Sequence, residues 1–550
     1  MDDPGIGVVE VDRCAGASGP PARTGRRGSR AALADRAAVA DLAERPQLAA
    51  IGLIAACAVL LLWPALLNGQ YIVFSDTPGY VRGAARAFDL LLGVESEWSA
   101  LYDPSAASQG SVEAATSARL SADGYVQAGR SIYYGTMIYI GALIGSMWAG
   151  LVAQSVAVAT AIYIIFRAFD VGKGATWSIP LIALATPASF FASYLMPDIF
   201  AGVAILGIAS LVVLWDRLRP WMRMTMAGLL AFSLLVHASH LALALALIGP
   251  AIIVSLLCSR RFRARSGILV AGIILFALAA ELTFYRSVEA VYGHSPVRPP
   301  FLMARVLADG PGTEFLRASC PESNFVLCDH LDALPMDADR FLWSEDGIYS
   351  QMTPPMREAL SDEQIPILVG ALWHDPAGQA RAAFLNAVEQ FARFSIEEFK
   401  YPHSLEDIME ANMPPAEFRE FLNSSLHRQQ FPLPEINVLF QALLMVAAAY
   451  LVFSLLRQVL DGSAVATGSR RGATTISDAR ADGRLLLAVV AIVLLGVLLN
   501  AAITGALSTP HDRYQARVIW LVPMLALLVH AWRRRARQRC FRRRDRYGRH

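Results

Sequence analysis

Residues 485–505 read LLLAVVAIVLLGVLLNAAITG, a run of about 20 residues without one charged side chain. An apolar helix of that length spans the hydrocarbon core of a bilayer. Similar runs recur along the 550-residue chain, which is 55 % hydrophobic and only 17 % charged, with a mean hydropathy of +0.42. This composition excludes a disordered protein, a coiled coil and an ordinary cytosolic enzyme. It predicts a polytopic membrane protein.

The apolar runs predict ten transmembrane helices, so the expected fold class is all-α. A further helix, at residues 132–147, is expected to lie at the membrane interface, because the apolar run from 132 to 166 is too long for one span. The predicted spans are 48–67, 148–168, 176–194, 199–216, 224–238, 240–258, 267–284, 436–456, 484–505 and 516–532.

Arginine clusters predict the orientation of these spans. They precede the first span, follow the fourth, sixth and eighth, and crowd the C-terminal end from Arg533 to Arg549. If the spans alternate, every cluster falls on one side, which the positive-inside rule identifies as the cytoplasm. Lysine occurs only at positions 173 and 400, as is typical of a GC-rich bacterial genome. We therefore expect a bacterial inner-membrane protein with both termini in the cytoplasm.

This topology divides the chain into five parts. The sequence predicts a disordered cytoplasmic tail at 1–47, a transmembrane module at 48–285 with an outer loop at 68–131, a periplasmic helical domain at 286–432, three more spans within 433–532, and an Arg-rich cytoplasmic tail at 533–550.

The long outer segment is acidic, with 11 Lys and Arg against 22 Asp and Glu in residues 286–432. Its apolar residues Phe384, Leu385, Val388, Phe391 and Phe394 recur at helical spacing, and we expect them to form a domain core rather than a sugar-stacking surface. The periplasm permits disulfides. Two cysteines lie in this segment, Cys320 and Cys328, and they either form a disulfide or remain unpaired thiols.

Motifs of soluble catalysis are absent: the sequence contains no GxxxxGK[ST], HExxH or GxSxG, and no strand-borne GxGxxG. Two acids instead stand beside predicted spans. Asp76, in GQYIVFSDTPGY (69–80), is either a general base or a helix cap. Asp198, in SYLMPD (193–198), is costly between apolar blocks unless it has a function, a partner or a capping role.

Two further outer turns carry basic side chains. His237 and His240, in VHASH, would meet a phosphate or a metal, or form a pair bonded to backbone. The turn PHDRYQAR (510–517) contains His511, Arg513, Tyr514 and Arg517 on the side that is otherwise poor in arginine. Bidentate phosphate binding would explain these arginines, and an internal pair with Asp512 is the alternative.

The pattern resembles the GT-C superfamily of polyprenyl-phosphate-sugar-dependent integral membrane glycosyltransferases. Four features carry the resemblance: an acid after the first span, Asp76; an Arg-led aromatic helix before the second, from Arg130; a Tyr-x-x-x-Asp acid at the fourth, Asp198; and a large outer segment after the seventh. It covers about residues 48–260. Asp76 stands alone where many members have paired acids, and Arg-Ser-Ile-Tyr-Tyr-Gly replaces the usual Arg-Pro-Pro-x-Tyr-Pro entry.

The resemblance implies an enzyme that transfers a hexose or pentose from a polyprenyl-phosphate carrier to a glycan, lipid or protein acceptor in the cell envelope. Asp76 would be the catalytic base. It implies the bilayer as a partner and no nucleic acid, and it leaves open whether a divalent metal takes part. The substrate-binding residues would be Tyr80, Arg130, Asp198, His237, His240, His511, Arg513, Tyr514 and Arg517. The rival interpretations are an O-antigen ligase or polymerase, a transporter or flippase, and a non-catalytic envelope-assembly protein.

Overall fold

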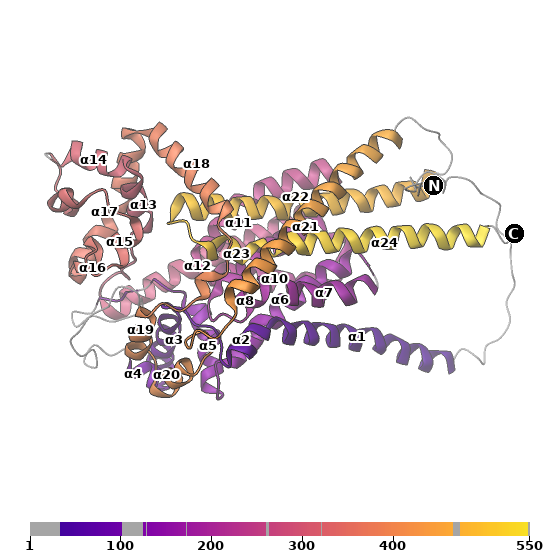
Figure 1. The fold of residues 1–550 in the computed structure, drawn as a ribbon, viewed down its shortest axis with the longest axis horizontal. Coiled ribbons are helices and arrows are strands. Elements are labelled where there is room, and N and C mark those ends of the chain that lie inside the picture. The colour runs from indigo at the N-terminus through magenta and orange to yellow at the C-terminus, as the bar shows by residue number, and fades with distance from the viewer. Residues whose placement is uncertain are drawn as a thin grey trace, which may run out of the picture.

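The computed structural model describes residues 34–101, 125–127, 129–171, 173–259, 263–320, 322–465 and 473–547. Within these ranges the protein is all-α, and β-pairing is limited to two isolated bridges, Ile72 with Tyr194 and Gln127 with Val297. A bundle of long helices carries smaller helices at one end (Figure 1).

The bundle helices overlap the predicted spans, and the second predicted span matches α6 residue for residue. They are α1 (Ala34–Leu61), α2 (Trp63–Asn68), α6 (Trp148–Ala168), α7 (Lys173–Ala185), α8 (Ala188–Ala192), α9 (Phe200–Val213), α10 (Pro220–Leu235), α11 (Ala238–Val254), α12 (Ala264–Tyr292), α21 (Leu433–Val465), α22 (Ala473–Leu507), α23 (Asp512–Ile519) and α24 (Leu521–Tyr547).

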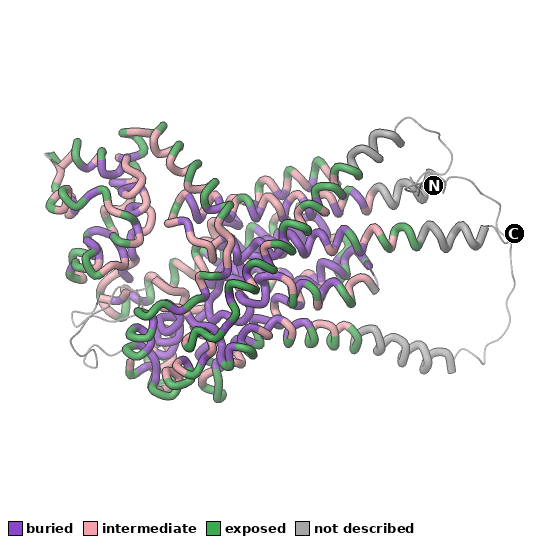
Figure 2. Tube along the Cα trace, in the orientation of Figure 1, coloured by how far each residue is buried: buried purple, intermediate pink, exposed green. Residues whose placement is uncertain are grey.

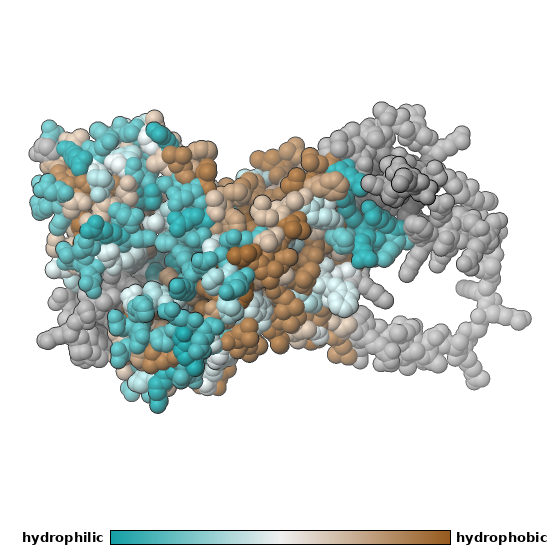
Figure 3. All heavy atoms as spheres, viewed as in Figure 1, coloured by the Kyte–Doolittle hydropathy of each residue, from teal (hydrophilic) through white to brown (hydrophobic). Residues whose placement is uncertain are grey.

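Six helical stretches of the described residues are long and apolar enough to cross a membrane, which identifies a multi-pass membrane protein. On the face shown in Figure 3, apolar side chains cover the middle of the bundle. Three predicted spans correspond to shorter apolar helices, at Leu48–Leu61, Gly174–Ala185 and Pro197–Val213, and the fifth predicted span, 224–238, overlaps α10, which belongs to neither group. The six stretches are Trp148–Ala168, Ala238–Cys258, Ala264–Tyr292, Leu433–Arg457, Ala481–Leu507 and Asp512–Gln538.

Two predicted boundaries differ from the structure. Residues 1–33 of the expected N-terminal tail lie outside the described residues, but α1 already begins at Ala34. The segment that follows Ala34 is rich in alanine, which has the highest intrinsic helix propensity. At the other end α24 continues as far as Tyr547, so the arginines that follow the last predicted span extend a helix.

The helix expected at the interface is α5 (Ile132–Leu143), and it packs against α3 (Thr77–Leu92). Gly135 makes this contact close, because a Cβ there would lie 2.1 Å from the carbonyl oxygen of Tyr80. The short helix α4 (Glu97–Ala100) follows α3, and residues 102–124 of the predicted outer loop lie outside the described residues.

The predicted outer segment 286–432 contributes to two separate cores. The first, which we call the outer unit, is built around Met303, Leu316, Phe341 and Leu360. Cys320 and Cys328 form a disulfide within it, so of the two alternatives, bridged or unpaired, the structure has the bridged one. The outer unit comprises α13 (Phe301–Asp309), α14 (Pro311–Ser319), η6 (Val326–Ala333), α15 (Ala338–Trp343), α16 (Ile348–Gln351) and α17 (Pro354–His374).

The rest of this segment packs on the bundle. Ile396, Phe399, Leu405 and Phe421 belong to the same buried core as the bundle helices. Figure 2 shows buried residues concentrated where these segments meet the bundle, with a smaller buried group in the outer unit. The elements are α18 (Pro376–Ala392), η7 (Glu397–Phe399), α19 (Ser404–Asn412) and α20 (Pro415–Leu422).

The prediction that the apolar stripe of residues 384–394 forms a domain core was wrong. Phe384, Leu385, Val388 and Phe391 are exposed, and only Phe394 is partly buried, against the bundle core. The reason is that α18 presents its other face to α22. Helical periodicity correctly predicted the helix and its apolar face, but it carried no information about what that face contacts.

Candidate functional site

Two loops that are distant in sequence lie side by side at the end of the bundle that carries the outer unit. Gly69 ends α2 with a φ of 79°, a left-handed conformation that suits glycine, and turns the chain into residues 70–76. There the backbone N–H of Ile72 donates to Ser193 over 2.9 Å, and Leu195 donates back to Ile72 over 2.9 Å. This pairing brings the loop that contains Asp76 next to the loop that contains Asp198.

Asp76 is buried and forms an ion pair with Arg130. It occupies the N-cap position of α3, yet its side chain makes no capping hydrogen bond. The capping alternative therefore does not describe Asp76. Arg130 binds Oδ1, and Oδ2 has no hydrogen-bond partner among the described residues.

The loop that carries Arg130 is fixed on both sides. Gln127 pairs with Val297 as an isolated bridge, and the Ser131 hydroxyl donates to the carbonyl of Leu235 over 2.8 Å. Burial alone would lower the pKa of Arg130, but the charge of Asp76, the hydrogen bond to it and the interaction with Tyr80 together outweigh burial, so the pKa is raised and the guanidinium stays charged.

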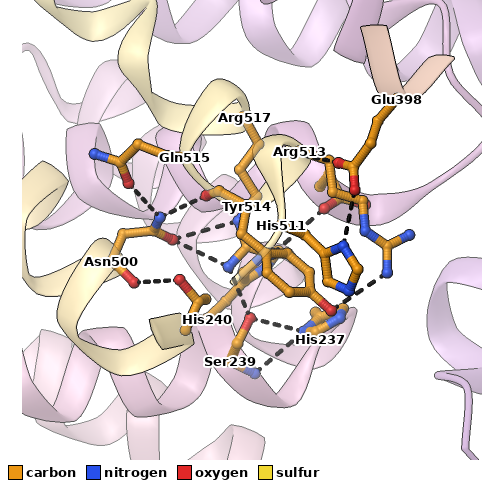
Figure 4. A network of polar contacts seen from close by, with 12 residues as sticks. His237, Ser239, His240, Glu398, Asn500, His511, Arg513, Tyr514, Gln515 and Arg517 are labelled. Carbon is orange, nitrogen blue, oxygen red and sulfur yellow. Dashed lines mark hydrogen bonds and ion pairs between the residues drawn. The ribbon is translucent and has the colours of Figure 1, made fainter. Parts of the chain in front are cut away.

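Asp198 forms the second buried pair, with Arg517, whose Nη1 lies 3.4 Å from the carboxylate Oδ1. Asp198 lies in η3 (Pro197–Ile199), and neither η3 nor α9 has a side-chain cap. Arg517 also donates to Asn500 over 3.0 Å and to the hydroxyl of Ser239 over 3.1 Å. Figure 4 shows this network, in which α11, α22 and α23 converge on one guanidinium.

Arg513 lies beside both pairs and interacts electrostatically with Asp76 and with Asp198. Its guanidinium stacks on Phe74, 4.2 Å from the ring centroid, and on Tyr514 at 5.0 Å. Its Nη2 donates to the Tyr514 hydroxyl over 3.3 Å, whereas the buried Nη1 has no hydrogen-bond partner in the part of the chain that the structure describes. An arginine held by aromatic rings with a free N–H is preorganised to bind an anion.

The two histidines of the VHASH motif lie next to this network, with ring centroids 5.1 Å apart. His237 caps α11 by accepting from the backbone N–H of Ser239 over 3.1 Å. His240 is fully buried and its Nδ1 bonds the carbonyl of Ser233 at 2.9 Å, which assigns the proton to Nδ1. Both histidines therefore bond the backbone, as one of the two sequence interpretations expected, but within the described ranges Nε2 of His240 has no hydrogen-bond partner.

His511 is bonded to carboxylates of two other segments, and its ring lies 5.4 Å from that of Tyr514. Its Nε2 lies 2.9 Å from Asp339 of the outer unit, and its Nδ1 lies 2.8 Å from Glu398. Burial alone would lower the pKa of His511, but hydrogen bonds to the two carboxylates outweigh it and raise the pKa to about 10. Because both ring nitrogens are engaged, His511 fastens the outer unit to the bundle and is not available to a substrate.

Tyr80 is buried in the wall of the site, its ring 5.1 Å from that of Tyr134 in an edge-on contact. Burial is the main cause that raises the pKa of Tyr80, so its hydroxyl stays protonated.

The structure thus brings together Asp76, Arg130, Asp198, Arg513, Tyr514 and Arg517, with Tyr80, His237 and His240 at their edge. We call the three guanidinium and two carboxylate groups of this set the arginine–aspartate cluster: Arg130, Arg513, Arg517, Asp76 and Asp198. The cluster has one positive charge in excess, and Arg130 Nε and Arg513 Nη1 are both buried without a hydrogen-bond partner among the described residues. Such a site is suited to an anion with one negative charge.

A metal is not indicated by the geometry. Across the described ranges no group of three or more His, Cys, Asp and Glu is arranged to hold a metal ion. Each of the two aspartates faces an arginine, which supplies the positive charge that a metal would otherwise bring.

Sequence analysis missed four members of the network. Asn500 could have been found, because it is a polar residue inside an apolar span. Ser239 lies within a motif that was singled out for its histidines. No local signal marks Asp339 or Glu398, whose roles depend on the packing of distant segments against His511.

In comparisons with family models, with curated proteins and with solved structures, no match to this chain was found.

Proposed function

We propose that the protein is a membrane glycosyltransferase that moves a sugar from a polyprenyl-phosphate carrier to a hydroxyl group of an envelope acceptor. The observation that supports this proposal is the arginine–aspartate cluster at one end of an apolar bundle. It combines a buried carboxylate with unpartnered guanidinium N–H groups, the two elements that such a transfer needs.

The charge of the cluster favours a monophosphate donor. A sugar linked to a polyprenyl phosphate carries one negative charge, which matches the single guanidinium in excess over the carboxylates. A diphosphate carrier would bring a second charge that the cluster does not balance, and burying an unbalanced charge is costly. The isoprenoid tail would lie among the apolar helices, and the phosphate would meet Arg513 and Arg517.

The reaction would proceed by direct displacement at the anomeric carbon. The acceptor hydroxyl gives its proton to Asp76 Oδ2 as its oxygen bonds to the anomeric carbon. The bond between that carbon and the phosphate oxygen breaks, and the polyprenyl phosphate leaves with an additional negative charge. Arg513 and Arg517 stabilise this charge. Asp198 holds Arg517, and Arg130 orients Asp76.

The proposal includes the finer topology. All ten predicted apolar segments would cross a bacterial inner membrane, with both termini in the cytoplasm and the outer unit in the periplasm. This sidedness supports a lipid-linked donor, because nucleotide sugars are confined to the cytoplasm. The acidic outer unit would lie where an acceptor approaches.

The test is a transfer assay with the purified full-length chain in liposomes. Radiolabelled polyprenyl-phosphate hexoses and pentoses are offered with a glycan and lipid extract of the cell envelope, and both labelled product and released polyprenyl phosphate are measured. We expect transfer from at least one donor by the wild type and none by Asp76→Asn. Transfer by Asp76→Asn at the wild-type rate, or no transfer from any donor, would refute the proposal.

A further inference from the structure

The outward face of α18 carries a stripe of large apolar side chains. Phe384, Leu385, Val388 and Phe391 are 67 %, 53 %, 53 % and 45 % exposed. Their spacing places all four on one side of the helix. Exposed apolar residues that occur singly are ordinary on a protein surface, but a continuous stripe marks a surface that contacts something else.

The opposite face of α18 is occupied by α22. A Cβ at Gly505 would lie 2.5 Å from the carbonyl oxygen of Asn386 and 2.9 Å from the Cα of Ala387, so the two backbones are in direct contact. Because α22 is one of the helices with membrane-spanning length and composition, α18 is held against a candidate membrane span over its second half.

The level of α18 relative to the membrane follows from two further contacts. The side chain of Gln390 donates to the carbonyl of His511 over 2.7 Å and accepts from its N–H over 2.9 Å. His511 directly precedes the candidate span Asp512–Gln538, and Gly505 lies near the end of Ala481–Leu507. Residues 386–390 of α18 therefore lie at the level where two spans begin and end, which is the membrane interface.

We infer that α18 is an interfacial helix whose stripe, Phe384, Leu385, Val388 and Phe391, is buried in the adjoining lipid leaflet. The span on which α18 packs also carries exposed apolar residues, since Leu498 and Leu507 of α22 are 51 % and 44 % exposed. In Figure 3, apolar side chains also lie at the place where Figure 1 shows α18. An amphipathic helix at this depth buries its apolar face at the boundary of headgroups and acyl chains.

This placement gives α18 a mechanical role. It connects the outer unit to residues 395–400, where the N–H of Ser395 donates to Asp512 over 3.0 Å and Glu398 binds His511. Lipid contact along α18 would fix the height of the outer unit above the arginine–aspartate cluster. The inference rests on packing alone and does not depend on the proposed transferase activity.

Spin labelling of the full-length chain in lipid nanodiscs tests the inference. Cys14, Cys258 and Cys540 are replaced by serine, whereas the fully buried Cys57 and the Cys320–Cys328 disulfide are kept. Single cysteines are introduced as Phe384→Cys and Val388→Cys. Two matched controls are Leu498→Cys on the exposed side of α22 and Glu345→Cys on the exposed surface of the outer unit. Power saturation measures the accessibility of each nitroxide to oxygen, which concentrates in lipid, and to a water-soluble nickel complex.

We expect the labels at 384 and 388 to resemble the label at 498, with oxygen accessibility several-fold above that for nickel. Nickel accessibility equal to that at 345 would overturn the inference, because the stripe would then face water. Dipolar broadening between labels would also overturn it, by showing that a second copy of the chain covers the stripe. Low accessibility to both reagents, with an immobilised spectrum, would assign the stripe to a protein contact and equally refute it.

Discussion

The carboxylate of Asp198 and the guanidinium of Arg517 are separated by 319 residues in sequence but by 3.4 Å in space, and both are almost completely buried. Removing one partner leaves the other charge buried and uncompensated, at a cost of about 3–5 kcal/mol. We therefore expect Asp198→Asn and Arg517→Met each to lower the Tm in detergent by several degrees.

The double variant Asp198→Asn/Arg517→Met provides the control for that prediction. Because it contains no uncompensated charge at the pair, its Tm should lie above the sum of the two single effects, as a double-mutant cycle would measure. Strictly additive losses would mean that the two side chains contribute separately.

Asp76→Asn should reduce the proposed transfer by about 10²- to 10⁴-fold, the usual contribution of a general base. Its Tm should also fall, because Arg130 loses the partner of a buried ion pair, so transfer is compared at a temperature at which both proteins remain folded. The matched control is Asp89→Asn, on the same helix, where the acid forms a partly exposed pair with Arg86. Equal losses in both variants would assign the effect to α3 rather than to the site.

Gly135→Ala should displace α5 from α3, because the new Cβ would lie 2.1 Å from the carbonyl oxygen of Tyr80. Overpacking of this kind costs about 1–3 kcal/mol, and here it would also shift Arg130, which immediately precedes α5, from Asp76. Gly228→Ala in α10, where a Cβ would meet nothing within 4 Å, should keep or raise the Tm. Thermal unfolding and transfer rates of the two variants give the comparison, and a Gly135→Ala protein equal to Gly228→Ala would contradict the close packing.

His511 should make stability depend on pH in a defined direction. Its pKa in the folded protein, about 10, lies above the value of 6.5 expected in the unfolded chain. The stabilisation that it provides is therefore complete below pH 6.5 and is lost as the pH rises towards 10. The Tm difference between wild type and His511→Gln, measured from pH 5.5 to 9.5, should shrink as the pH increases. A constant difference would show that His511 is not held in a charged state by Asp339 and Glu398.

The Cys320–Cys328 disulfide offers a test of sidedness, since disulfides persist outside the cytoplasm and are rare inside it. Non-reducing mass spectrometry of protein from intact membranes should find these two cysteines bonded. Their replacement by serine should destabilise the outer unit by roughly 2–3 kcal/mol for a loop of this length. Free thiols at both positions would place the outer unit on the cytoplasmic side.

The sequence predicted the features that depend on a single segment of the chain. Apolar runs predicted the positions of the bundle helices. The cost of a charge between apolar blocks singled out Asp198, the place of Asp76 after the first span singled out that acid, and the scarcity of arginine on that side singled out Arg517. The disulfide was one of two alternatives because only two cysteines lie in the outer loops.

Relations between segments were beyond the reach of sequence patterns. The pairing of Ile72 with Tyr194 joins two short loops without strand character. The fastening of His511 by Asp339 and Glu398 depends on how the outer unit and residues 395–400 meet the bundle. The stripe on α18 shows the same limit, since a helical period identifies an apolar face but not its surroundings.

The outer unit has a core of its own, from Met303 to Ile367, which shares no buried side chain with the core of the bundle. A core of this kind forms an independent cooperative unit, which can unfold while the neighbouring core stays folded. Calorimetry of the full-length protein should accordingly resolve two unfolding transitions, and native-state hydrogen exchange should release the amides of the outer unit first. The spanning helices would then persist as a folded platform from which the outer unit can detach and refold.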